Sequence, residues 1–270
     1  MTDVVPPAAP RWSDLRLRLV SAAVMITVGA AEIWLGGPAF AALVVALTGG
    51  MLWELARMTA PAQARAALAL GVLGAGALVL VLVAPADYAP ALLLVPSLAF
   101  ALTPRRDRRL ASLWAAAAMV AGYGLVVLRE EAGTPAILWV ICVVVASDVL
   151  GYFAGRMIGG RKFWPAVSPK KTWAGTVAGW LGAAAVGAGF VAAGLAPWTL
   201  VPLSALVAFA GQMGDIAESW IKRRAGVKDS SRLIPGHGGL MDRFDALVGA
   251  VVAVMALGLL VALPLPGQGG

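Results

Sequence analysis

The sequence predicts an all-α polytopic membrane protein with about nine transmembrane helices. Of its 270 residues, 60% are apolar and only 13% are charged, a balance far outside the range of soluble globular domains. The apolar residues recur in runs that are each near the ~20 residues needed to cross the hydrocarbon core. The Lys and Arg residues fall on alternate connections between these runs, as expected when the chain crosses a membrane repeatedly.

The first element is a disordered and basic segment, residues 1–16, followed by an apolar run over 17–35. This run is long enough to span, so we interpret it as an uncleaved helix and not as a signal peptide. We expect residues 17–264 to form a single transmembrane domain and 265–270 a short tail. The later apolar runs lie at roughly 38–56, 66–84, 88–103, 110–128, 135–155, 172–195, 198–222 and 245–264.

Two features of these apolar runs bear on the membrane topology. The run 88–103 is short and contains Pro90 and Pro96, so a tilted, a kinked and a re-entrant helix all stay open. With a cytoplasmic N-terminus and nine spans, all Lys and Arg residues except Arg129 fall on the cytoplasmic side, and the C-terminus lies outside. The net charge of +7 therefore reflects topology and gives no reason to expect nucleic-acid binding.

Acidic residues concentrate at the end of the run 198–222. Asp215, Glu218, Ser219 and Lys222 have the spacing i, i+3, i+4 and i+7, which places them on one face of a helix. Intramembrane acids are costly, so a polar face on an apolar helix indicates function.

A second pair of acids begins the next apolar run. Asp242 and Asp245 share a helix face near its N-terminus, so the two helices can point carboxylates at each other. Carboxylates beside Lys and Arg suit a hard cation such as Mg²⁺ that also binds phosphates. The intervening Pro235-Gly236-His237-Gly238-Gly239 has little side-chain bulk, which lets backbone N–H groups approach an anion. The pattern indicates phosphate chemistry.

These motifs carry a family resemblance. The segments Ser219-x-x-Lys222-Arg223, Lys228-Asp229-Ser230 and Leu233 to Asp245 resemble the signature of phosphatidate cytidylyltransferases, also called CDP-diacylglycerol synthases. The block Ser168-Pro169-Lys170-Lys171-Thr172-Trp173 resembles a second loop of the same family. The resemblance covers most of the chain and is strongest from residue 148, with the motifs concentrated in 148–245.

The resemblance implies an enzyme of phospholipid biosynthesis that joins CTP and phosphatidate to give CDP-diacylglycerol and pyrophosphate. It implies an integral protein of the cell (inner) membrane, with the active site facing the cytoplasm and Mg²⁺ as cofactor, a second cation being left open. We expect Asp215, Asp242 and Asp245 as metal ligands; Lys222, Lys228, Asp229, Arg243 and Asp148 as catalytic residues; and Ser168, Lys170, Lys171, Arg232 and His237 as contacts to CTP or lipid phosphates.

The chain departs from the family pattern near Asp148. The family segment usually reads Asp-Thr-Gly-Ala-Tyr, whereas Val149 and Leu150 stand here at the second and third positions. Ala174 stands where the family commonly has Glu, so that acid is dispensable here. His237 is not needed as a base, because a phosphate monoester with a second pKa of about 6 is already mostly deprotonated at neutral pH.

Several alternatives stay open. A CTP-dependent polyprenol or phytol kinase would share the membrane setting and the acidic helix ends, and an ion transporter would also explain intramembrane acids. Glu32 and Glu54 lie near the ends of apolar runs, so they are either functional or interfacial. Small-residue helix faces favour either a homodimer or internal packing.

Overall fold

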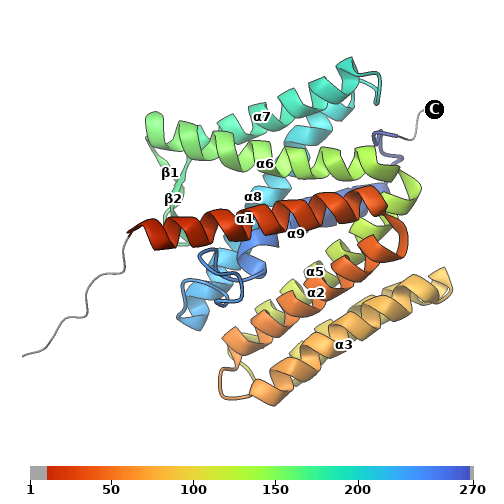
Figure 1. Cartoon of the computed structure of the whole chain (residues 1–270), viewed down its shortest axis with the longest axis vertical. Coiled ribbons are helices and arrows are strands. Elements are labelled where there is room, and N and C mark those ends of the chain that lie inside the picture. Colours follow the sequence, from red (N-terminus) through yellow and green to blue (C-terminus); the bar gives the residue numbers. More distant parts are fainter. Residues whose placement is uncertain (1–10, 268–270) are drawn as a thin grey trace, which may run out of the picture.

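The computed structural model describes residues 11–267, so residues 1–10 of the predicted disordered and basic segment 1–16 lie outside the described residues, as do 268–270. Residues 11–16 of that segment form the start of the first helix. Within that range the chain forms nine α-helices, one 3₁₀ turn and a two-stranded hairpin (Figure 1). The elements are α1 (Arg11–Leu35), α2 (Gly37–Thr59), α3 (Ala64–Val83), η1 (Ala86–Tyr88), α4 (Ala89–Leu102), α5 (Arg108–Glu131), α6 (Gly133–Met157), β1 (Lys162–Trp164), β2 (Ser168–Thr172), α7 (Trp173–Ala192), α8 (Leu200–Ala225) and α9 (Met241–Gly258).

The helices confirm a polytopic membrane protein. Seven of those described, namely α1, α2, α3, α5, α6, α7 and α8, are long and apolar enough to cross a bilayer. Helix α4 has 14 residues and contains Pro96. Helix α9 carries Asp242, Arg243 and Asp245 in its first two turns. Nine spans and the orientation of the chain therefore stay predictions.

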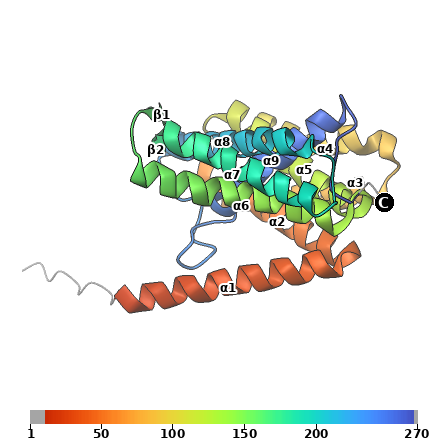
Figure 2. The same cartoon turned by 90° about the horizontal axis from the view of Figure 1, so that it is seen from above.

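The helices other than α1 pack as two groups. Helices α2 to α5 contact one another, as do α6 to α9, and α9 also packs on α5. Helix α1 lies apart from the bundle along most of its length (Figure 2), and none of its apolar window is buried. The hairpin β1–β2, the loop between α8 and α9 and the first residues of α1 all lie at one end of the molecule (Figure 1). These are the segments that the charge pattern assigns to the cytoplasm.

Helices α8 and α9 approach each other closely because glycines face each other at their crossing. A Cβ atom on Gly249 would lie 2.9 Å from the Cα of Gly214, which is closer than packed side chains allow. Only glycine at both positions permits this backbone contact. The contact brings Asp215 and Glu218 of α8 next to Asp245 of α9.

The hairpin between α6 and α7 was not predicted from the sequence. Its antiparallel strands pair Lys162 with Thr172 and Trp164 with Ser168, with a bulge between the two pairs. Thr172 also caps α7, because its Oγ1 accepts a hydrogen bond from the Gly175 N–H at 3.2 Å. The hairpin therefore holds the Lys170-Lys171 pair at the start of α7.

Candidate active site

A cavity of about 730 Å³ lies between α6, β2, α7, α8 and the start of α9. It gathers residues that are far apart in the sequence but belong to the motifs singled out above. The predicted site residues that line it are Asp148, Lys170, Lys171, Asp215, Lys222, Asp229, Asp242, Arg243 and Asp245. Acidic and basic side chains thus line one cavity, whose volume is in the usual range for small-molecule and cofactor sites.

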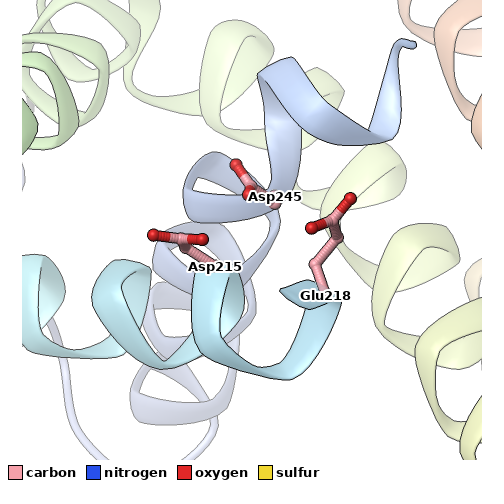
Figure 3. Close-up of side chains that lie close together, drawn as sticks. All are labelled: Asp215, Glu218 and Asp245. Carbon is pink, nitrogen blue, oxygen red and sulfur yellow. The ribbon is translucent and has the colours of Figure 1, made fainter. Parts of the chain in front are cut away.

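Three carboxylates form a cluster in this region. Asp215 and Glu218 lie one turn apart on α8 and point toward Asp245 on α9 (Figure 3). One oxygen from each of the three residues lies within 4.8 Å of the others. The Glu218 side chain is completely buried, and its carboxylate forms an ion pair with Lys222. Three carboxylates that converge in this way, one of them fully buried, suit a hard divalent cation.

Lys222 joins this cluster to the start of α9. Its Nζ lies 2.6 Å from Glu218 Oε2 and 2.6 Å from Asp242 Oδ1. The second oxygen of Asp242 accepts the backbone N–H groups of Ser230 and Gly239 at 2.9 and 2.8 Å. Asp242 therefore contacts Lys222 and the loop before α9, and it lies outside the three-carboxylate cluster.

The hairpin contributes a second basic side chain, Lys171. Lys171 Nζ lies 2.5 Å from Asp215 Oδ2 and donates to the backbone carbonyl of Gln212 at 3.2 Å. The Gln212 side chain is itself fixed, since it donates to Ser147 Oγ at 3.1 Å and accepts from Trp180 Nε1 at 3.0 Å. Lys171 is thus held at the cavity wall by Asp215, whereas Lys222 contacts Glu218 of the same cluster.

The loop between α8 and α9 folds back on itself. The Ile234 N–H donates to the Gly238 carbonyl at 2.8 Å, and Gly236 and Gly238 have φ of 76° and 86°, which favours glycine. Ser21 Oγ of α1 donates to the Pro235 carbonyl at 2.9 Å and lies 2.8 Å from His237 Nδ1. His237 therefore contacts α1, which agrees with a role in organising the loop.

Comparison with known proteins identifies the family. Residues 16–261 match the cytidylyltransferase family. The chain belongs to this family. A phosphatidate cytidylyltransferase of Brucella abortus is 35% identical over 264 residues, which cover 93% of this chain and 96% of the relative. Those of Staphylococcus saprophyticus and Mycobacterium bovis are 40% and 39% identical over 132 and 137 residues, which cover 47% and 48% of this chain and 51% and 44% of the relatives.

Membership in the cytidylyltransferase family confirms the resemblance and makes the chain a nucleotidyltransferase, so the cavity is its candidate active site. The structure does not bring every predicted residue to the cavity wall. Ser168 pairs with Trp164 in the hairpin, and three loop residues also lie outside the lining: Lys228, Arg232 and His237. Arg243 does line the cavity and donates to the His237 carbonyl at 3.0 Å. The individual roles of all these residues stay predictions.

Sequence reasoning missed two acids. The i+3 spacing places Glu218 on the same helix face as Asp215, and the structure adds Glu218 to the carboxylate cluster, which the predicted ligand set does not include. For Glu54 the sequence leaves a functional and an interfacial position open, and the structure places it fully buried against the loop before α9. No local pattern around Glu54 indicates that contact.

Proposed function

We propose that this chain is a phosphatidate cytidylyltransferase, which converts CTP and phosphatidate to CDP-diacylglycerol and pyrophosphate. The observation that carries the proposal is the cavity in which the family motifs meet: a cluster of carboxylates for a cation, with Lys171 and Lys222 on either side. The Brucella abortus relative, which matches nearly the whole chain, is a phosphatidate cytidylyltransferase.

The reaction is an in-line displacement at phosphorus. A phosphatidate oxygen attacks the α-phosphorus of CTP and forms the new P–O bond. The bond from this phosphorus to the bridging oxygen breaks, and pyrophosphate leaves with the electron pair. The attacking phosphate is already deprotonated at neutral pH, so the site needs no general base. Its task is to position two anions and to neutralise their charge.

The residues divide this task. We assign Asp215, Glu218 and Asp245 to a divalent cation, Mg²⁺, which when bound would neutralise phosphate oxygens. Lys170, Lys171, Lys222 and Arg243 supply positive charge along the cavity wall. Asp242 orients Lys222. In the sequence-based alternative Asp242 is a ligand, and Mn²⁺ binding to Glu218→Gln and Asp242→Asn distinguishes the two assignments.

The membrane setting completes the proposal. The cavity lies at the end of the bundle that holds the basic loops, so it faces the cytoplasm, where CTP is available. Residues 17–264 form the single transmembrane catalytic domain. The diacyl chains of phosphatidate stay in the bilayer while the headgroup enters the cavity. A homodimer stays a prediction from the small-residue helix faces.

Labelled CTP tests the proposal. Purified protein is incubated with phosphatidate, Mg²⁺ and CTP labelled at either the α- or the γ-phosphate. Label from the α position in the lipid product supports the proposal. Label from the γ position, with an added polyprenol or phytol, would instead support a lipid kinase. Absence of lipid labelling from both positions contradicts an enzyme of either kind and favours transport.

A further inference from the structure

Glu54 of α2 holds the loop before α9 with both of its carboxylate oxygens. Oε1 accepts from Ser231 Oγ at 2.6 Å and from the Leu240 N–H at 2.9 Å. Oε2 accepts from Ser230 Oγ at 3.0 Å and from the Met241 N–H at 2.8 Å. The side chain is completely buried, and its four donors are neutral. A buried carboxylate is tolerated when its oxygens are saturated by donors in this way.

The loop is held from two sides. Glu54 binds the two ends of the segment, Ser230-Ser231 and Leu240-Met241, while Asp242 Oδ2 accepts the N–H groups of Ser230 and Gly239. Ser230 Oγ lies within hydrogen-bond distance of both carboxylates. Gly239 has no room for a side chain, because a Cβ atom would collide with Ser230 Oγ and the Glu54 carboxylate. The glycine in this motif is therefore explained by the contact with Glu54.

The contact also sets where α9 begins. Leu240 and Met241 supply N–H groups that the helix itself cannot satisfy, and a carboxylate at a helix N-terminus stabilises its first turn. Asp242, Arg243 and Asp245 follow directly within that turn and the next, and all line the cavity. Glu54 itself is not part of the cavity lining, so it acts on the site only through α9 and the loop.

We propose that Glu54 is a positioning residue for the reaction. It fixes the start of α9 and the loop over 228–240, so that Asp242, Arg243 and Asp245 face the cavity in one arrangement. This inference rests on the proposed function, because it assigns Glu54 a role in that same site. The competing explanation is that Glu54 only stabilises the packing of α2 on α9, with no effect on turnover by the folded protein.

Glu54→Gln separates the two explanations. The amide keeps the size of the side chain but retains only one acceptor oxygen, so Leu240 or Met241 loses its acceptor. We expect kcat/KM for CTP to fall roughly 10–100-fold, mainly through kcat, since bonds to a charged acceptor are among the stronger ones. Ser231→Ala removes one donor of the same contact, so its effect on kcat should be non-additive with that of Glu54→Gln.

Ser97→Ala is the matched control. Ser97 is a buried hydroxyl that exchanges hydrogen bonds with Ser112 of α5, away from the loop. Its loss should lower thermal stability without changing kcat per folded molecule. If Glu54→Gln also lowers only stability and leaves kcat/KM at the wild-type value, Glu54 has a purely structural role and the proposal is wrong.

Hydrogen exchange gives a readout that does not depend on activity. At least one of the Leu240 and Met241 amides should exchange ~10-fold faster or more in Glu54→Gln than in wild type, and both should exchange at the wild-type rate in Ser97→Ala. Unchanged exchange in Glu54→Gln would overturn the inference. Wild-type protein that transfers no α-label to lipid would instead contradict the proposed function, while the exchange rates would still decide whether Glu54 holds α9.

Discussion

The sharpest prediction concerns Glu218→Gln, which removes one negative charge from the carboxylate cluster without changing its shape. The clustered oxygens lie within 4.8 Å of one another. Two unit charges at that separation interact by about 3.5 kcal/mol at an effective dielectric constant of ~20. Removing Glu218 therefore weakens attraction for a divalent cation, but it also relieves repulsion from Asp215 and Asp245.

The net loss is smaller than the attraction alone. Because the amide oxygen of the variant still offers the cation one ligand atom, we expect cation affinity to fall by about 1.4–2.8 kcal/mol, or ~10–100-fold. Without cation the variant should be at least as stable as wild type, because the repulsion of Glu218 from Asp215 and Asp245 is removed while Lys222 keeps Asp242 as its partner. A lower affinity for the cation combined with unchanged or higher thermal stability is thus the expected signature.

Manganese binding gives the measurement. Mn²⁺ replaces Mg²⁺ as a paramagnetic probe, and its affinity for purified protein is read by electron paramagnetic resonance without substrate. The Mg²⁺ dependence of turnover is measured in parallel. Glu131→Gln is the control, since Glu131 is an exposed acid at the end of α5. If Glu218→Gln binds Mn²⁺ like wild type while Asp242→Asn does not, the ligands are those predicted from sequence and the cluster assignment is wrong.

Three further predictions follow from other contacts. Asp242→Asn should lower kcat by ~10²-fold, because Lys222 and the loop lose the carboxylate that they contact. The Mn²⁺ affinity should stay close to that of wild type, and a parallel loss of Mn²⁺ binding would make Asp242 a ligand. Gly249→Ala should lower the free energy of unfolding by about 1–3 kcal/mol in thermal unfolding, because the added Cβ atom would collide with α8. The control, Gly189→Ala, has open space around it and should not lower stability. Equal stability of the two variants would contradict the close α8–α9 contact. Single cysteines at Arg232 and Gly269, with Cys142→Ala, should react with an impermeant thiol reagent from opposite sides of the membrane, and same-side labelling would contradict nine spans.

The helices were predictable because their signal is local. Each apolar run needs about 20 residues to cross the bilayer, and most observed helices begin and end within a few residues of the predicted runs. The first helix begins at Arg11 and not at 17, and the last begins at Met241 and not at 245. The last helix shows why its start was hidden from the sequence. Its apolar residues start late, but its first turn is stabilised by Glu54, which caps Leu240 and Met241 from another helix.

The hairpin was missed for a related reason. The segment over 162–172 contains lysines and prolines and shows no regular alternation of apolar and polar residues. Its structure depends on contacts with α7, where Phe163 packs edge-to-face on Trp173 at 4.7 Å. Sequence could therefore identify Lys170 and Lys171 as candidates, but not the backbone that presents them.

The sequence motif alone does not determine whether Asp242 or Asp245 faces the carboxylates of α8. Both acids lie near the start of one helix, and their spacing of three residues leaves them on similar faces. What separates them is the contact of Gly214 with Gly249, which fixes how α9 sits on α8. In that arrangement Asp245 faces Asp215 and Glu218, whereas Asp242 reaches Lys222 and the loop.

Lys222 makes these two groups of contacts interdependent. One ammonium group lies 2.6 Å from both Glu218 and Asp242, so it partly neutralises the carboxylate cluster while holding the start of α9. A divalent cation bound by Glu218 would satisfy that carboxylate and leave Lys222 available to a phosphate oxygen, still oriented by Asp242. Cation binding and phosphate binding should therefore favour each other, because without the cation the Lys222 ammonium would have to neutralise both Glu218 and the phosphate.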